Sequence, residues 1–232
     1  MRKGQQITKS HETKKKIRAA ALELFCTKGY DLSTMRDIAM KAGMSVGSTY
    51  YYFSTKEELV LDFYAATQDE AAENNLLLIE ESTSFKKRLE GLLQFRMRQL
   101  TPYRSFIGVL GRNAADRGHA LSPFGEKTKP IRDESIELFS EIMNGSNLKC
   151  ARELKPYLPV LLWLYQMGLV FFWIHDSSEG QNHTQMLLKQ TVFMVTKLIR
   201  LSKVPVMKPV NRSLEILMKT LGSPTQLAVN NG

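Results

Sequence analysis

Apolar residues recur at the spacing of a helical face along most of this 232-residue chain. Ile17, Ala21 and Leu24 open the pattern, and segments with the same spacing follow as far as residue 203. No run of residues alternates apolar and polar side chains, as a half-buried strand would. The sequence therefore predicts an all-α protein.

Two short helices with a break between them are expected in residues 34–53. Thr34, followed three residues later by Asp37, gives a capping signal before an apolar stretch. Gly43 then ends the first helix, and Ser45 can cap the second. This is the spacing of a helix-turn-helix, in which the second helix enters the major groove of DNA, although an ordinary helical hairpin has a similar pattern.

The neighbouring helices have boundary signals of their own. Ser10 and Gly29 mark the expected ends of the preceding helix. Ser54 with Glu57 forms another capping signal, which is expected to start a long connecting helix. The expected domains are a basic helix-turn-helix domain with an N-terminal arm at 1–56, a helical ligand-binding and dimerisation domain at 57–221, and a disordered polar tail at 222–232.

Positive charge is concentrated in the first quarter of the chain. Residues 1–56 hold eleven Lys or Arg and four Asp or Glu, and the net charge of the whole chain is +9. Such an excess favours nucleic acid or an anionic membrane surface as a partner. A solvated basic arm that serves solubility is the alternative.

Four consecutive rings run from Tyr50 to Phe53. Successive helical residues are turned by about 100°, so the rings cannot all face a core. Phe53 lacks a hydroxyl and is expected to be buried, with Thr49 one turn earlier on the same face. The other side chains offer hydroxyls for phosphates and apolar groups for thymine methyls. This candidate DNA-reading surface comprises Val46, Gly47, Ser48, Tyr50, Tyr51 and Tyr52.

The sequence TMRDIAMKAGMSVGSTYYYFSTKEEL at 34–59 resembles the DNA-binding domain of the TetR family of bacterial transcriptional regulators. The resemblance covers about residues 11–60 and implies a helix that reads the major groove and a separate helical domain that senses a small molecule. By position, Thr34 and Arg36 resemble contacts to the groove edge and phosphates, and Lys56 resembles a phosphate clamp. Thr49 departs from the family pattern, which has an aliphatic residue there.

The family resemblance leaves the basic residues of the first helix open. They could contact the DNA backbone or remain solvated, and phosphate contact is expected for one or two of them. These residues are Lys14, Lys15, Lys16 and Arg18.

The segment 157–175 is apolar almost without interruption. Such a run can span a membrane, but a helix buried in an oligomer interface has the same composition. Pro159 shortens the run and no flank is enriched in positive charge, so no membrane insertion is expected. The resemblance implies a homodimer through helices near 157–175 and 183–203, whose two-fold axis would present two recognition helices to a pseudo-palindromic double-stranded DNA operator.

Large aromatic and methionine side chains near this segment suit the wall of a cavity for a small apolar effector. Ordinary core or dimer packing is the alternative for each of them. The candidates are Trp163, Met167, Phe171 and Phe172, with Phe106 and Leu110 on the opposite wall.

No nucleophile stands at a readable spacing from a base, and no metal-ligand pattern or glycine-rich phosphate loop is present, so neither an enzyme nor a cofactor is expected. Two distant cysteines and no visible secretory signal favour the cytoplasm. The predicted function is a ligand-responsive repressor that leaves its operator when an effector binds. The alternatives are an activator, a ligand-independent repressor, or a basic helical protein that binds a membrane or partner protein.

Overall fold

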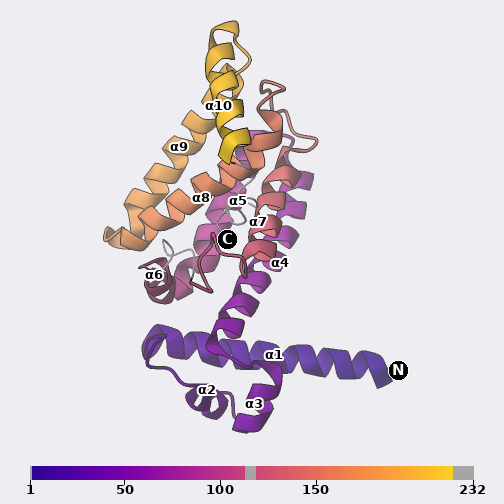
Figure 1. Ribbon diagram of the computed structural model, residues 1–232, viewed down its shortest axis with the longest axis vertical. Helices are drawn as coiled ribbons and strands as arrows, with labels where there is room; N and C mark the ends of the chain where they lie inside the picture. Colours follow the sequence, from indigo (N-terminus) through magenta and orange to yellow (C-terminus); the bar gives the residue numbers. More distant parts are fainter. Residues whose placement is uncertain (1, 113–118, 222–232) are drawn as a thin grey trace.

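The computed structural model describes residues 2–112 and 119–221, and within these residues the chain forms helices joined by turns and no strand, which confirms the all-α prediction. Figure 1 shows α1 to α3 at one end, with α4 rising from them into a larger helical body. The helices are α1 (Arg2–Thr27), α2 (Met35–Lys41), α3 (Val46–Tyr52), α4 (Lys56–Glu81), α5 (Phe85–Leu100), α6 (Arg104–Arg112), α7 (Lys129–Met143), α8 (Leu158–His175), α9 (Asn182–Leu201) and α10 (Lys208–Leu221).

Two hydrophobic cores share α4. Its first turns supply Leu59 and Phe63 to a core with α1 and α2, and Ala71 belongs to a second core with α5, α7, α8 and α9. Helix α6 also packs into the first core, through Phe106 and Leu110. The N-terminal unit of α1, α2 and α3 is therefore joined to the helical body by α4 and by α6.

The caps of α2 and α3 follow the sequence signals. The Thr34 hydroxyl accepts from the Asp37 backbone N–H at 3.1 Å, and the Asp37 carboxylate accepts from the Thr34 backbone N–H at 2.9 Å. The Ser45 hydroxyl accepts from the Ser48 backbone N–H at 3.0 Å. Gly43 has a φ of 63°, a left-handed conformation that glycine adopts without strain, and so allows the turn between the two helices.

Two helix boundaries differ from the expectation, and one helix is additional. Helix α1 begins at Arg2 and not near Ser10. Thr55, rather than Ser54, caps α4 through its hydroxyl, while the Glu58 carboxylate accepts from the Ser54 backbone N–H at 2.6 Å. Helix α10 was not anticipated, and the expected polar tail at 222–232 lies outside the described residues.

Helix α8, with the turn before it, is the one described segment long and apolar enough to cross a membrane by length and composition. Core helices of soluble proteins can have the same length and apolar composition. Leu162, Trp163 and Trp173 are buried against other helices, whereas Phe171 and Phe172 are exposed. One face of α8 is therefore core and another is left uncovered in the single chain.

The C-terminal end of α8 is fixed to two other helices. Arg104, at the start of α6, donates to the carbonyl groups of Trp173, Ile174 and Asp176. The Asp176 carboxylate accepts four hydrogen bonds from the backbone and hydroxyl groups of Ser178 and Thr184, which lies in the first turn of α9. Burial alone would raise the pKa of Asp176, but these bonds outweigh it and hold the pKa below its ordinary value.

Candidate nucleic-acid interface and ligand cavity

Helix α3 divides its rings between a buried and an exposed side. Phe53, which directly follows the helix, is 3% exposed, and Thr49 is fully buried. The Thr49 hydroxyl donates to the Ser45 carbonyl at 3.1 Å, which satisfies the polar group that the departure from the family pattern puts in the core. Tyr51 is 83% exposed, and its ring makes an edge contact with that of Tyr52 at 5.1 Å between centroids.

The remaining candidates of the reading surface lie around Tyr51 on α3, Val46 and Tyr50 on one flank and Ser48 and Tyr52 on the other. Val46, Gly47 and Tyr50 are exposed, while Ser48 and Tyr52 are half-buried. The surface is uncharged, and its side chains carry hydroxyls, rings and one small aliphatic group. Such groups can bond phosphates and contact thymine methyls when the helix lies in a major groove.

The three candidates outside α3 have different surroundings. Thr34 uses its hydroxyl to cap α2, and Arg36 on the first turn of that helix is exposed. Lys56 is half-buried and donates to the carbonyl of Tyr30 at 2.7 Å and more weakly to that of Asp31 at 3.4 Å. Its ammonium also lies 4.5 Å from the centre of the Tyr30 ring. Lys56 thus fastens the loop after α1, a role that its sequence context did not reveal.

The four basic residues of α1 that were candidates for phosphate contact, Lys14, Lys15, Lys16 and Arg18, separate into two kinds. Arg18 forms an ion pair with Asp62 of α4 at 2.7 Å and therefore joins two helices of the same unit. Lys14, Lys15 and Lys16 are exposed, and the ammonium of Lys14 lies 5.7 Å from the centre of the Phe53 ring. Of these four candidates, the lysines are consequently better placed than Arg18 to meet phosphates beside α3.

An apolar cavity of about 450 Å³ lies in the helical body, bounded by α4, α5, α6, α7 and α8. Four of the expected wall residues line it: Leu110, Trp163, Met167 and Phe171. Phe124, from the connection before α7, adds a ring whose centroid lies 5.6 Å from that of Trp163 in an edge contact.

Two of the expected wall residues do not line this cavity. Phe106 has no exposed surface, and its ring lies 5.1 Å from that of Phe25 in the core beside α1. Ile107, the next residue, faces the cavity instead. Phe172 lies on the outer surface of α8, where it is 41% exposed. A continuous apolar helix does not show which of its residues face inward, so the sequence could not separate these cases.

The cavity wall also contains polar side chains that the sequence reading missed. Arg96 and Gln68 are at least nine-tenths buried, as are Arg132 and Gln166. A signal was present for Arg96, since it lies on the apolar stripe of α5 formed by Leu89, Leu92, Leu93 and Leu100.

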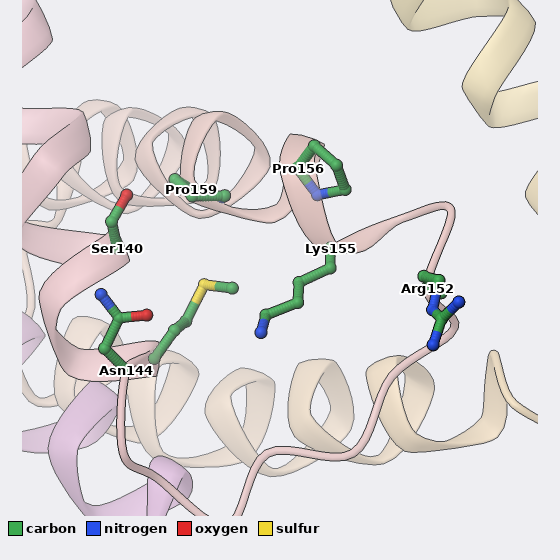
Figure 2. Close-up of a pocket in the computed structure, with 7 residues that line it drawn as sticks. Ser140, Asn144, Arg152, Lys155, Pro156 and Pro159 are labelled. Atoms are coloured by element: carbon green, nitrogen blue, oxygen red, sulfur yellow. The ribbon is translucent and has the colours of Figure 1, made fainter.

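A second pocket of about 470 Å³ opens between the end of α7 and the segment before α8 (Figure 2). Lys155 points into it between Asn144 and Arg152 (Figure 2). Its polar lining side chains are exposed or half-buried, so it is a surface hollow that offers less desolvation to a ligand than the apolar cavity. Among residues 2–112 and 119–221, no three His, Cys, Asp or Glu side chains are grouped as metal ligands would be.

An apolar face without a partner runs along α8 and α9. Isolated exposed apolar residues are ordinary, but a contiguous group marks an interaction surface. On α9, Met194 is 57% exposed and lies on the side of the helix opposite to the buried Val192 and Ile199. The exposed apolar residues of the two helices are Phe172, Met186, Phe193, Met194, Leu198 and Leu201, together with Leu164 and Phe171, which also line the cavity.

Two family models match the sequence. One, described as "Bacterial regulatory proteins, tetR family", matches residues 17–63. The other, described as "Tetracyclin repressor-like, C-terminal domain", matches residues 88–216, which is more than half of the chain. No match was found among curated protein sequences.

Several solved structures share the fold. A regulator of the tetR family from Streptomyces coelicolor aligns with a TM-score of 0.61 at 15% identity, over 91% of this chain and 96% of that one. A TetR regulator from Nitrosomonas europaea gives 0.58 at 19% identity, over 78% and 96%. FadR from Thermus thermophilus, a TetR-family repressor solved in complex with lauroyl-CoA, gives 0.51 at 16% identity, over 82% and 95%.

Proposed function

The chain belongs to the TetR family of bacterial transcriptional regulators, and from this premise we propose that it is a ligand-responsive repressor. In this proposal a homodimer binds a pseudo-palindromic operator through two copies of α3. A small, largely apolar effector enters the cavity and favours an arrangement of the two DNA-binding units, α1 to α3 of each subunit, that no longer fits the DNA. The ligand must bind that arrangement more tightly than the DNA-bound one, because equal affinity for both would shift nothing.

The observation that carries the proposal is the position of α6 between the cavity and the DNA-binding unit. Phe106 is buried beside Phe25 of α1, whereas Ile107 lines the cavity. Leu110 touches both, since it belongs to the core beside α1 and to the cavity wall. A ligand that displaces α6 would therefore act directly on the unit that carries α3.

Helix α6 is also held closely against α8. Arg104 binds the carbonyl groups at the end of α8. A Cβ added to Gly108 would lie 3.3 Å from the Cγ2 of Ile174, so the two helices approach closely there. Motion of α6 should consequently be transmitted to α8 as a packed unit.

DNA binding is tested by fluorescence anisotropy with the duplex upstream of the gene and a scrambled duplex of the same length. We expect tight binding to the first duplex only, with log K falling linearly against log salt by about 0.9 per phosphate contact. Equal binding to both duplexes would contradict a specific regulator. Co-sedimentation with anionic vesicles in place of specific DNA binding would favour the membrane-binding alternative, and transcription that rises when the protein is bound would favour an activator.

The dimer face of α8 and α9 is tested with Met194→Glu. Because a two-fold interface places the same patch on both subunits, the substitution would bury two like charges near each other. An uncompensated buried charge costs about 3–5 kcal/mol, so the dimer dissociation constant should rise more than about a hundredfold. Sedimentation velocity measures the change. Arg98→Gln, at an exposed position of α5, alters the net charge equally and should remain dimeric; a dimeric Met194→Glu variant would place the interface elsewhere.

A further inference from the structure

Two arginines lie on the apolar stripe of α5, and their surroundings differ. Arg88 is 3% exposed and is fully engaged, because its guanidinium donates to the carbonyl groups of Ser82, Ile142, Asn144 and Ile79. Such a set of acceptors is what a structural buried arginine requires. Arg88 therefore has an explanation in the fold alone.

Arg96 is buried to a similar degree, with 5% of its surface exposed, but is only partly engaged. Its Nη1 donates to the Thr67 carbonyl at 2.8 Å and to the Gln99 side-chain oxygen at 3.0 Å. Its Nε is buried without a hydrogen-bond partner, and Nη2 makes no hydrogen bond with the described residues. The unoccupied edge of the guanidinium, Nε with Nη2, is the edge that can hold a carboxylate with two parallel hydrogen bonds.

No carboxylate of the described chain neutralises Arg96 by direct contact. Glu70 is close enough to favour the charged form, but its carboxylate accepts a hydrogen bond from Gln99 at 2.7 Å. Burial lowers the pKa of Arg96 to about 10, with Glu70 opposing the shift, so the side chain remains a cation at neutral pH. A cation in an apolar wall is costly unless a counter-charge meets it.

Arg96 lines the cavity together with a second side chain that has unused hydrogen-bonding capacity. The side-chain oxygen of Gln68 is buried without a partner, and its nitrogen makes only a long contact of 3.5 Å with Thr67. An amide that rotates about its last bond can present either a donor or an acceptor. The α4–α5 wall thus has a polar end, and Arg132 and Gln166 line the cavity from α7 and α8. Ile107, Met167 and Ile174 supply the apolar surface at α6 and α8.

We propose that the effector is an amphiphile with a carboxylate head, which Arg96 binds through Nε and Nη2 while its apolar chain lies along α6 and α8. This inference rests on the proposed effector role of the cavity and narrows its ligand from an apolar molecule to an anionic one. Gln68 donates a further hydrogen bond to the head group. The position of the head on α4 and α5 and of the chain against α6 explains how one ligand contacts both connections to the DNA-binding unit.

The test compares decanoate, decan-1-ol and decylamine, which share one chain and differ in the charge of the head group. Isothermal titration calorimetry with the DNA-free dimer should show that decanoate binds at least about tenfold more tightly than decanol, because a hydrogen bond to a charged group is worth about that factor. Decylamine should bind most weakly. Equal affinity for the three probes, or no binding of decanoate, would overturn the proposal.

Arg96→Gln should reduce the affinity for decanoate to about that for decanol and leave decanol binding unchanged. Arg98→Gln, an exposed position on the same helix, is the matched control and should retain the preference. If circular dichroism shows that Arg96→Gln does not fold, Arg96→Lys keeps the charge but lacks the two-pronged edge, and it should lose most of the preference. A variant that retains the full preference for decanoate would overturn the assignment of Arg96.

Operator release is scored separately. A protein that binds decanoate through Arg96 but stays on its DNA would contradict the ligand-responsive repressor and leave the ligand assignment standing. A protein that releases its DNA with decanol as readily as with decanoate would retain the repressor and refute the anionic head group.

Discussion

Replacing Tyr51 by alanine should lower the specific affinity for the operator by about tenfold to a hundredfold, the range for losing one good base contact. Tyr51 is 83% exposed on α3 and touches only Tyr52 among the described rings, so its loss removes little that holds the fold. The free energy of unfolding should therefore stay within about 0.5 kcal/mol of the wild-type value. Anisotropy titrations and urea denaturation measure the two quantities.

Replacing Phe53, two residues after Tyr51, should have the opposite effect and destabilise the fold. The Phe53 ring is buried, and truncating a buried phenylalanine costs about 3–5 kcal/mol. Phe53→Ala should thus unfold the domain at lower urea concentration and weaken binding to every duplex. Tyr51→Phe, which keeps the ring and removes the hydroxyl, separates phosphate bonding from ring contact. A Tyr51→Ala variant that unfolds like Phe53→Ala would show that Tyr51 supports the fold and does not read DNA.

The division of these rings could be predicted because it depends on neighbours in the sequence. The cap at Ser45 fixes where α3 starts, and the helical turn then puts Thr49 on the side that becomes buried. Thr34 and Asp37 likewise fix the start of α2. The start of α4 is less well determined by the sequence, because Ser54 and Thr55 are adjacent residues that can both cap a helix.

Contacts between distant segments could not be predicted in this way. The family resemblance predicts a phosphate clamp at Lys56, and it did not reveal that the ammonium also binds the carbonyl of Tyr30, 26 residues earlier. Phe106 and Ile107 are both apolar, and only the packing of α6 between two cores decides that they face different sides. Arg96 was recognisable as a charge on an apolar stripe, yet its meaning depends on α4 and on the cavity, which the pattern of α5 does not contain.

The packing of Phe106 leads to the second large expected effect. Phe106→Ala should lower the free energy of unfolding by about 3–5 kcal/mol, because it removes a fully buried ring beside Phe25, Tyr30 and Phe63. Ile107→Ala, one residue further, enlarges the cavity and should change effector affinity while leaving operator binding without effector unchanged. Urea denaturation, calorimetry and anisotropy distinguish the two variants.

A milder substitution at Phe106 tests whether α6 transmits the effect of the bound ligand to the DNA-binding unit. Phe106→Leu keeps most of the apolar volume, so the protein should fold and bind decanoate with nearly wild-type affinity. If the contact of α6 with α1 transmits the effect, this variant should need more decanoate to release its operator, because filling the cavity would move the DNA-binding unit less. Release at the wild-type concentration, together with unchanged decanoate affinity, would instead assign transmission to α4, whose residues Tyr64, Thr67 and Gln68 line the same cavity.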